Sequence, residues 1–231
     1  MCGRFTLTAD PDTLRQVFAL GKTSAAALAE LSPRYNVAPS QPVAVAVADS
    51  DGGRKLEFLR WGLIPSWAKD PKIGSRMINA RAETLAEKPS FRTALKKRRC
   101  LILADGFYEW KREGTLRAKT PMYIQLKSGE PFALAGLWEF WRPLDSDADA
   151  FIKSCAIITI TPNALMEKIH DRMPVILKPQ AYDLWLTPGE LPAERTRPLL
   201  KPFAASQMKA ITVSTLVNNT ANDSPECVRP V

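Results

Sequence analysis

The second residue of the chain, Cys2, offers the most distinctive chemistry in the sequence. It follows Met1 directly, and cells generally remove an initiator methionine when the next residue is small. A cysteine at the N-terminus carries an α-amine with a pKa near ~8 and a thiol with a pKa near ~8.5 on adjacent carbons. An aldehyde that meets this 1,2-aminothiol forms an imine with the amine, and the thiol then closes a five-membered thiazolidine ring. The alternative is that Cys2 has no chemical role.

Two interior segments carry polar side chains that a protein core does not require. Residues 78–84 place Asn79 and Arg81 at the start of a predicted helix, a position suited to binding an anion or a sugar oxygen. Ordinary helix capping is the alternative for this segment. Residues 169–174 contain the only histidine, His170, whose charge changes in the physiological pH range. A catalytic role and a structural role both fit His170.

A third polar segment, residues 105–110, contains Glu109 within a predicted strand. On a strand Glu109 shares a face with Phe107, because alternate side chains point to the same side. A carboxyl group beside aromatic rings is expected to have a raised pKa, which suits it to proton transfer near neutral pH. The alternative is an ordinary solvated carboxylate.

The composition limits the class of protein. The 231 residues suit one compact domain, which we expect to span residues 1–231. The formal net charge of +8 favours an anionic partner, with nucleic acid as the first choice. No secretory leader opens the chain and no apolar segment approaches the ~20 residues that span a bilayer, so we expect a soluble, cytoplasmic protein. The four cysteines form no C-x-x-C pair, and we expect no metal, cofactor or disulfide framework.

The hydrophobic pattern predicts many strands with short helices between them and no regular alternation of the two. The predicted strands are residues 3–8, 43–48, 56–61, 100–104, 107–111, 121–127, 132–138 and 155–161. The predicted helices follow Asp10-Pro11 and occupy residues 24–31, 82–87, 90–97, 163–168 and 180–186. This order favours an α+β fold, a single domain built on a curved, barrel-like and mainly antiparallel sheet with short peripheral helices.

Two proline-bounded segments are predicted to be loops. Residues 33–42 contain three prolines and predict an ordered loop. Residues 62–67 predict a loop that presents Trp67, an aromatic ring able to stack on an unpaired base. Residues 92–99 are rich in arginine and lysine, which is typical of a phosphate-binding surface or of a solvated helix face.

The motifs together resemble those of one protein family. In chain order they are MCGRF (1–5), RYNVAP (34–39), WGLIP (61–65), INAR (78–81), GFYEW (106–110) and HDRMP (170–174). This series resembles the SRAP family, the SOS response-associated peptidase domain, over essentially the whole chain. The resemblance implies a sensor of abasic sites in single-stranded DNA that crosslinks itself to the damage.

The resemblance also implies roles for individual residues. The nucleophile of the family falls on Cys2, and further active-site positions fall on Asn79, Glu109 and His170. Positions that resemble phosphate contacts fall on Arg4, Arg81 and Arg172, and a rim that handles bases falls on Pro39 and Trp67. Ala68 departs from members that carry a second aromatic there, which predicts a thinner stacking platform.

An abasic deoxyribose exposes an aldehyde when its hemiacetal ring opens, and we expect Glu109 to move the proton that opens it. The Cys2 amine then attacks C1′ and the thiol closes the thiazolidine, while Asn79 and His170 orient the sugar hydroxyl or donate protons. An imine that persists can instead undergo β-elimination, a lyase side reaction.

Two other functions remain open at this stage. One is a cysteine peptidase or self-processing enzyme in which His170 is the base for Cys2 and Asn79 orients the histidine. The other is a module that binds single-stranded DNA reversibly and without covalent chemistry. We expect a monomer, and single-stranded DNA with abasic sites as its partner.

Overall fold

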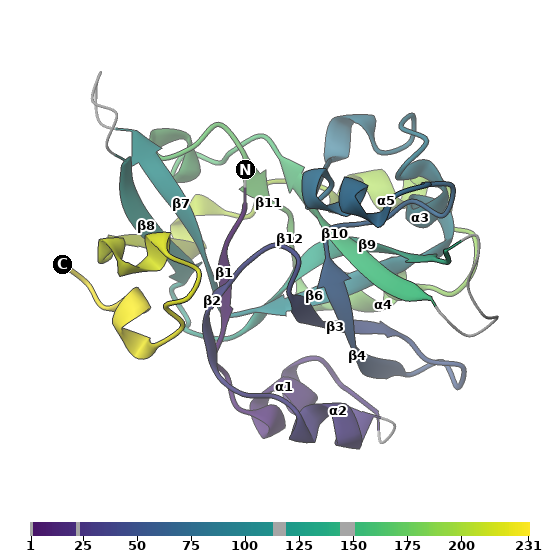
Figure 1. Ribbon diagram of the computed structural model, residues 1–231, viewed down its shortest axis with the longest axis horizontal. Helices are drawn as coiled ribbons and strands as arrows, with labels where there is room; N and C mark the ends of the chain where they lie inside the picture. Colours follow the sequence, from purple (N-terminus) through teal and green to yellow (C-terminus); the bar gives the residue numbers. More distant parts are fainter. Residues whose placement is uncertain (1, 22–23, 113–118, 144–150) are drawn as a thin grey trace.

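A closed ring of five strands forms the centre of the molecule. The computed structural model describes residues 2–21, 24–112, 119–143 and 151–231. Around the ring the strands follow in the order β10 (Ile152–Ile160), β4 (Arg54–Trp61), β3 (Pro42–Ala48), β6 (Arg99–Ala104) and β9 (Phe132–Trp141). The ring closes because β10 pairs with β4 on one side and with β9 on the other (Figure 1). The predicted barrel-like sheet is confirmed.

Three short strands extend the barrel. β11 (Met173–Pro174) pairs with β10, and β12 (Ile176–Leu177) pairs with β9. β5 (Asn79–Arg81) lies parallel to β10, which also runs parallel to β4. The other pairings of the barrel sheet are antiparallel, as predicted. Asn79 and Arg81 therefore lie on a strand. Arg81 is also the N-cap of the 3-10 turn Ala82–Thr84 and so does lie at the entry to a helical turn, whereas Asn79 lies within the strand.

A second sheet packs against the barrel. Its strands follow in the order β13 (Met208–Thr212), β8 (Lys119–Leu126), β7 (Gly106–Arg112), β1 (Phe5–Leu7) and β2 (Arg34–Val37). In Figure 1, β1 and β2 run between the β7–β8 hairpin and the barrel. Part of the proline-bounded segment predicted as a loop is therefore strand β2, because β1 supplies it with an antiparallel partner.

Strands β3, β6 and most of β9 are buried on both faces, which explains their nearly continuous apolar sequences, whereas β4 is only partly buried and carries four charged residues. In β6, Leu101 and Leu103 pack in the cluster that contains the helices, whereas Cys100 and Ile102 pack in the cluster that contains the second sheet. The alternation follows from the two-residue period of a strand. Each face of β6 therefore has its own hydrophobic layer.

The helices cover the outside of the barrel. They are α1 (Pro11–Val17), α2 (Ala25–Ala29), α3 (Arg92–Lys97), α4 (Tyr182–Leu186) and α5 (Ala193–Thr196). Short 3-10 turns occupy Pro71–Arg76, Ala82–Thr84, Met166–Lys168, Pro179–Ala181, Arg197–Leu199, Ala205–Gln207, Thr215–Asn218 and Pro225–Val228. None of the helices in the described ranges is long and apolar enough to cross a membrane.

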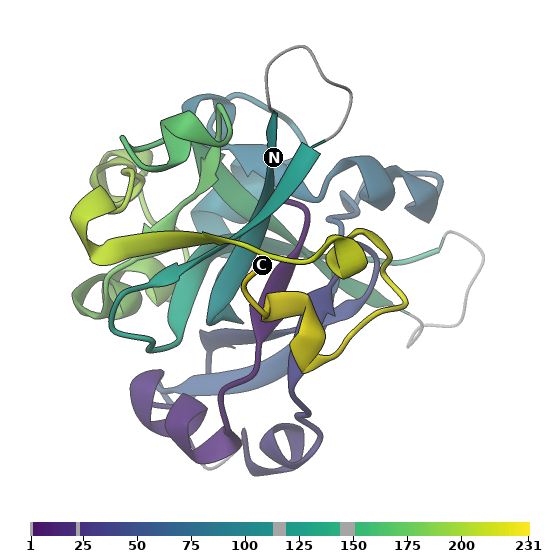
Figure 2. The same ribbon diagram turned by 90° about the vertical axis from the view of Figure 1, so that its left-hand side faces the viewer.

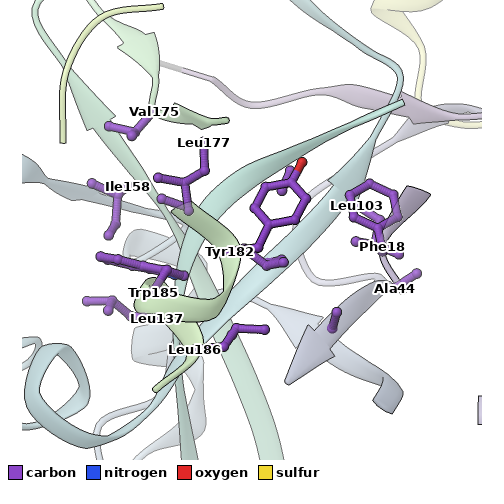
Figure 3. Packing of buried hydrophobic residues seen from close by; sticks show 14 of the residues in the cluster. Phe18, Ala44, Leu103, Leu137, Ile158, Val175, Leu177, Tyr182, Trp185 and Leu186 are labelled. Atoms are coloured by element: carbon purple, nitrogen blue, oxygen red, sulfur yellow. The ribbon is translucent and has the colours of Figure 1, made fainter. Parts of the chain in front are cut away.

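Helix α4 shows how the helices are attached. Tyr182 stacks on Phe18 of the chain after α1, with ring centroids 5.8 Å apart. The indole nitrogen of Trp185 donates to the backbone oxygen of Cys100 over 3.0 Å. Figure 3 shows the Trp185 ring beside Leu137 and the Tyr182 ring beside Phe18 and Leu103. Full burial of such a side chain contributes roughly 1.5–3 kcal/mol, so α4 fixes the outer surface of β6 and β9.

The basic segment 92–99 is only partly available to a ligand. Arg99 is buried and donates to the backbone oxygens of Leu95 and Trp185, each over 2.8 Å, at the ends of α3 and α4. Arg98 forms an ion pair with the buried carboxylate of Glu139. These two guanidinium groups therefore hold the fold together and contribute little to a phosphate-binding surface.

Candidate active site

Cys2 lies in the segment before β1, from which Gly3 and Arg4 separate it, at the junction between the second sheet and the barrel. The residue is buried, and Met1 lies outside the described residues. The backbone oxygen of Arg4 accepts a hydrogen bond of 3.0 Å from the amide of Tyr108, which continues the β1–β7 ladder toward Cys2. Burial, followed by the charge of Glu109, raises the pKa of the Cys2 thiol well above its usual range. The thiol is therefore protonated at neutral pH in this setting.

Asn79 connects Cys2 to the barrel. Its Nδ2 atom donates to the backbone oxygen of Cys2 over 2.8 Å. Asn79 is held in place because it pairs with Ile157 of β10 and because the indole of Trp61 donates to the backbone oxygen of Ile78 over 2.9 Å. The Asn79 Oδ1 atom is buried and has no hydrogen-bond partner among the described residues. A buried amide oxygen in this condition is suited to accept a hydrogen bond from a bound hydroxyl group.

Glu109 reaches the same junction from β7. Its side chain lies on the same face of the strand as Phe107, and the residue is 2% exposed. Burial raises the pKa of Glu109 to about 7. The predicted raised pKa is confirmed, and desolvation is its main cause. The carboxyl group can therefore both accept and donate a proton near neutral pH.

His170 faces Glu109 from the segment before β11. Its Nε2 atom lies 3.9 Å from Oε2 of Glu109. Burial lowers the pKa of His170, which favours the neutral imidazole. Its Nδ1 atom accepts a 3.0 Å hydrogen bond from the Arg172 amide and also lies 2.9 Å from Oδ1 of Asp171.

These two contacts of Nδ1 favour opposite protonation states. The amide of Arg172 always carries its hydrogen and requires a lone pair on Nδ1, whereas the carboxylate of Asp171 favours a proton there. The side chain of Asp171 is 88% exposed, so water screens its charge. The amide contact therefore decides the state, and the proton of neutral His170 lies on Nε2, toward Glu109.

The three predicted phosphate-binding arginines have different surroundings. Arg81 is exposed and forms no ion pair with any residue in the described part of the chain. Arg172 binds both carboxylate oxygens of Glu83, over 2.7 and 2.9 Å, and donates to the backbone oxygen of Thr159. Arg4 donates from Nη1 to Oδ1 of Asn36 and to the backbone oxygen of Val217, each over 2.7 Å. Arg81 is therefore the most accessible of the three.

Trp67 lies on a surface loop, as predicted, and is 58% exposed. It borders a basic pocket of about 440 Å³ together with Lys69, Lys72 and Arg76. Ala68 occupies the position where some family members carry a second aromatic residue. It is buried, and its backbone oxygen accepts a hydrogen bond from the indole of Trp141. Pro39 is half-buried in the turn between β2 and β3.

The loop that carries Trp67 has both ends attached to β10. The amide of Gly62 donates to the backbone oxygen of Cys155 over 2.8 Å, and the amide of Ile157 donates to Ile78 over 3.0 Å. At the base of the loop Gly62 has a φ of 129°, and a Cβ atom there would lie 2.6 Å from the backbone oxygen of Gly74. Only glycine fits this close approach.

A sequence profile of the SRAP family, described as SOS response associated peptidase, matches residues 1–220. The chain belongs to the SRAP family. The abasic site processing protein YoqW of Bacillus subtilis is 49% identical over 228 residues, which cover 99% of each chain. The abasic site processing protein HMCES of Xenopus tropicalis is 33% identical over 269 residues, which cover 100% of this chain and 78% of HMCES.

Solved structures agree with this assignment to the SRAP family. A crystal structure of a protein from Bacteroides thetaiotaomicron has a TM-score of 0.87 at 28% identity, and the match covers 100% of both chains. A second crystal structure, from Bordetella bronchiseptica, has a TM-score of 0.74 at 28% identity and covers 92% of this chain and 100% of the other. The barrel and the second sheet are thus the SRAP fold.

Sequence reasoning missed two residues near the SRAP site. Lys119, at the start of β8, lowers the pKa of both Glu109 and His170 by its charge, although its effect is smaller than that of burial. Only the pairing of Arg112 with Lys119 in the β7–β8 hairpin reveals this proximity. Asn36 is buried and contacts Arg4. Its position within the RYNVAP motif was the one available signal.

In the described parts of the SRAP domain, no group of three or more histidine, cysteine, aspartate or glutamate side chains is placed to hold a metal ion. The four cysteines are all free thiols.

Proposed function

We propose that this protein processes abasic sites in single-stranded DNA by linking itself covalently to the open sugar through Cys2 after removal of Met1. Its SRAP relatives YoqW and HMCES are named abasic site processing proteins. The net charge of +8 suits a polyanionic partner. We further propose that it acts on DNA inside the cell, as a monomer and without a metal or cofactor.

One observation carries this proposal: Asn79, Glu109 and His170 lie on separate elements and converge on the segment that begins with Cys2. Asn79 contacts the backbone oxygen of Cys2, and the charge of Glu109 acts on the Cys2 thiol. His170 faces Glu109 across 3.9 Å. A reactive terminus, a neutral-range acid and base, and an unsatisfied amide oxygen are the groups that carbonyl capture requires.

The first step is the opening of the sugar ring. Glu109 as the carboxylate removes the proton of the C1′ hydroxyl, the bond between C1′ and O4′ breaks, and O4′ takes up a proton. The aldehyde oxygen that forms accepts a hydrogen bond from the Nε2–H of His170, and the new O4′ hydroxyl donates to Oδ1 of Asn79. A positioned acid or base of this kind contributes roughly 10²–10⁴-fold to a rate.

The second step forms two bonds to C1′. The free amine of Cys2 adds to the aldehyde carbon, and loss of one water molecule gives an imine. The Cys2 sulfur then bonds to the same carbon, the electrons of the C=N double bond move to nitrogen, and the thiol proton passes to that nitrogen. Aldehyde and aminothiol thus combine with the net release of one water. Glu109 and His170 carry these protons between the reacting atoms.

The DNA strand is held by charge and by stacking. Arg81 is exposed on β5, the strand that carries Asn79, and would contact a flanking phosphate, with Arg4 and Arg172 as further sources of positive charge. Trp67 would stack on a neighbouring base at the basic pocket, and Pro39 would border the strand. Contacts of this kind confer affinity without sequence preference.

A lyase side reaction follows if the imine persists. The positive nitrogen of an iminium acidifies the C2′ proton, and its removal expels the 3′ phosphate by β-elimination. Ring closure by the Cys2 thiol competes with this cleavage because it consumes the imine. We therefore propose that the thiol protects the strand as well as fixing the adduct.

A peptidase reaction fits the site less well. A catalytic cysteine attacks as a thiolate and needs a lowered pKa. Burial acts in the opposite direction on Cys2 and raises the pKa of its thiol. The capture of an aldehyde avoids this difficulty, because the amine attacks first and the thiol loses its proton only during ring closure.

Intact-mass measurement tests the proposal. Purified protein is incubated with single-stranded DNA that contains one abasic site, with an undamaged strand of the same sequence, and with a peptide mixture. We expect protein lacking Met1 to gain the mass of the abasic strand minus one water, and the undamaged strand to give no adduct. Reversible binding alone, or cleavage of the peptides without an adduct, would refute it.

A further inference from the structure

The last segment of the chain is fastened to the strand that carries the reactive terminus. We propose that Asn36, together with residues 217–223, is a positioning device that fixes Cys2 against Glu109; this inference rests on the proposed function of Cys2. We call residues 217–223 the C-terminal strap. Figures 1 and 2 show the C-terminal segment, in yellow, packed beside β1 and β2.

Asn36 is the centre of this contact. The residue is fully buried, and its Nδ2 atom donates to three backbone oxygens of the strap, those of Val217, Asn219 and Asn222, over 3.2, 3.0 and 2.7 Å. Its Oδ1 atom accepts the 2.7 Å hydrogen bond from Arg4. One amide group therefore joins the strap to a residue only two positions after Cys2.

Arg4 makes the same connection from the other side. Besides Asn36, its guanidinium binds the backbone oxygen of Val217 over 2.7 Å and lies 5.8 Å from the centre of the Trp110 ring. The indole of Trp110 donates to Oδ1 of Asn218 over 2.7 Å. Since Trp110 directly follows Glu109 on β7, the strap holds both the strand that leads to Cys2 and the strand that carries Glu109.

The strap is itself anchored to β2. Oδ1 of Asp223 accepts the amide hydrogens of Tyr35 and Asn36, over 2.5 and 2.9 Å, and its other carboxylate oxygen pairs with Arg34. The hydroxyl of Tyr108 donates to the backbone oxygen of Tyr35 over 2.7 Å. β1, β2, β7 and the strap thus form one hydrogen-bonded unit around Arg4.

None of these groups touches a reacting atom, so their effect is on geometry. A displacement of about 1 Å in a reacting group can cost on the order of 100-fold in rate, whereas contacts with the rest of the DNA strand stay in place. Loss of Asn36 should therefore lower the rate of bond formation. Arg4 keeps its charge and its hydrogen bond to Val217 in such a variant, so the affinity for DNA should change little.

The test compares Asn36→Ala with Leu95→Ala, a variant of a buried residue in α3 that lies outside the strap and the site. Crosslinking of abasic single-stranded DNA is followed under single-turnover conditions over a range of protein concentrations. We expect Asn36→Ala to lower the limiting rate by about 10-fold to 100-fold, with the half-saturating concentration unchanged within about twofold. Leu95→Ala should lose thermal stability but keep the wild-type limiting rate.

A milder variant covers the case in which Asn36→Ala does not fold. Trp110→Phe keeps an aromatic ring beside Arg4 and removes only the hydrogen bond to Asn218. We expect its limiting rate to fall by a smaller factor, about threefold, as befits the loss of one of several contacts. An unchanged limiting rate in both variants would overturn the inference.

Hydrogen exchange separates this inference from the proposed function. We expect the amides of residues 3–8 to exchange faster in the Asn36 or Trp110 variant, while those of β10 keep their protection. This result would support the positioning role even if the wild-type protein formed no adduct, an outcome that would refute the proposed function. Unchanged exchange in residues 3–8 would overturn the positioning role even if the wild-type protein crosslinked readily.

Discussion

The side-chain amide of Asn79 donates a 2.8 Å hydrogen bond to the backbone oxygen of Cys2. Asn79 pairs with the long strand β10, so this bond places the N-terminal segment relative to the barrel. The Oδ1 atom of the same amide, which has no hydrogen-bond partner within the described part of the chain, then lies beside the residue proposed to attack the sugar. In the proposed reaction, this one side chain both positions the nucleophile and offers an acceptor to the substrate.

Replacing the nucleophile tests the covalent step. Cys2→Ala keeps the terminal amine but cannot close the ring, and the imine that remains hydrolyses. We expect this variant to form no adduct that survives heating in SDS, while borohydride still traps an imine. Cys227→Ala, which alters another buried thiol, should crosslink like the wild-type protein. A stable adduct in Cys2→Ala would refute thiazolidine formation.

The pH dependence of crosslinking reports on Glu109. Its pKa is raised to about 7, so the carboxylate proposed to accept the ring-opening proton accumulates as the pH rises through that value. We expect the single-turnover rate to increase with an inflection near pH 7, separate from that of the α-amine near ~8. Glu109→Gln should lose the first inflection and slow the reaction on the order of 100-fold. A Gln variant with the wild-type profile would contradict this role.

The same carboxyl group should destabilise the fold at high pH. The pKa rises from 4.5 to about 7 on folding, so the folded state binds the proton more tightly than the unfolded state. The stabilising contribution of Glu109 is present below pH 4.5 and is lost as the pH rises through about 7. The loss amounts to about 3 kcal/mol.

Glu109→Gln removes this dependence, because the amide does not titrate. We expect the Gln variant to gain stability relative to the wild-type protein between pH 4 and pH 8, as measured by urea unfolding at both values. If the Gln variant and the wild-type protein differ in unfolding free energy by the same amount at both pH values, Glu109 titrates normally in the folded state.

Two arginines should separate DNA binding from stability. Arg81→Ala removes an exposed guanidinium, so we expect weaker DNA binding and an unchanged melting temperature. The slope of the logarithm of the DNA-binding constant against the logarithm of the salt concentration should become shallower by about one. Arg172→Ala removes the contacts with Glu83 and Thr159, so it should lower the melting temperature as well. Salt titrations measure binding and thermal melts measure stability in both variants. Equal melting temperatures for the two variants would contradict the structural role of Arg172.

Stacking is tested at Trp67. We expect Trp67→Ala to weaken binding of single-stranded DNA by about 1–3 kcal/mol, the usual contribution of a base stacked on an aromatic ring. Phe151→Ala is a matched control, because Phe151 is 51% exposed and lies outside the basic pocket. Similar losses of affinity in both variants, measured by fluorescence anisotropy, would argue against a specific role for Trp67.

The barrel was predictable from sequence because its strands leave a strong pattern. β3 and β6 are buried on both faces and consist almost entirely of apolar residues. β2 left no such signal, since its RYNV sequence depends on pairing with β1 and on capture by Asp223, nearly 190 residues later. Likewise β5 is a strand only because β10 provides a parallel partner for Asn79.

The site was predictable to a similar degree. The burial of Glu109 and its raised pKa followed from a carboxyl group on an aromatic strand face. The hydrogen bonds of Arg4 and Arg172 were not predictable from the sequence, because their acceptors are mostly backbone oxygens and a carboxylate from distant segments. Any residue type can supply a backbone acceptor, so only the folded chain reveals which arginine side chains are held by the protein itself.

The attachment of both ends of the Trp67 loop to β10 bears on how this surface can diversify. Gly62 bonds to Cys155 and Ile78 to Ile157 on the same strand, so the intervening residues leave and return at fixed points. Changes at the exposed residues of this loop, such as Trp67, can reshape the outer rim without shifting Asn79. Lineages could therefore adapt to differently structured nucleic acids while inheriting an unaltered reaction centre.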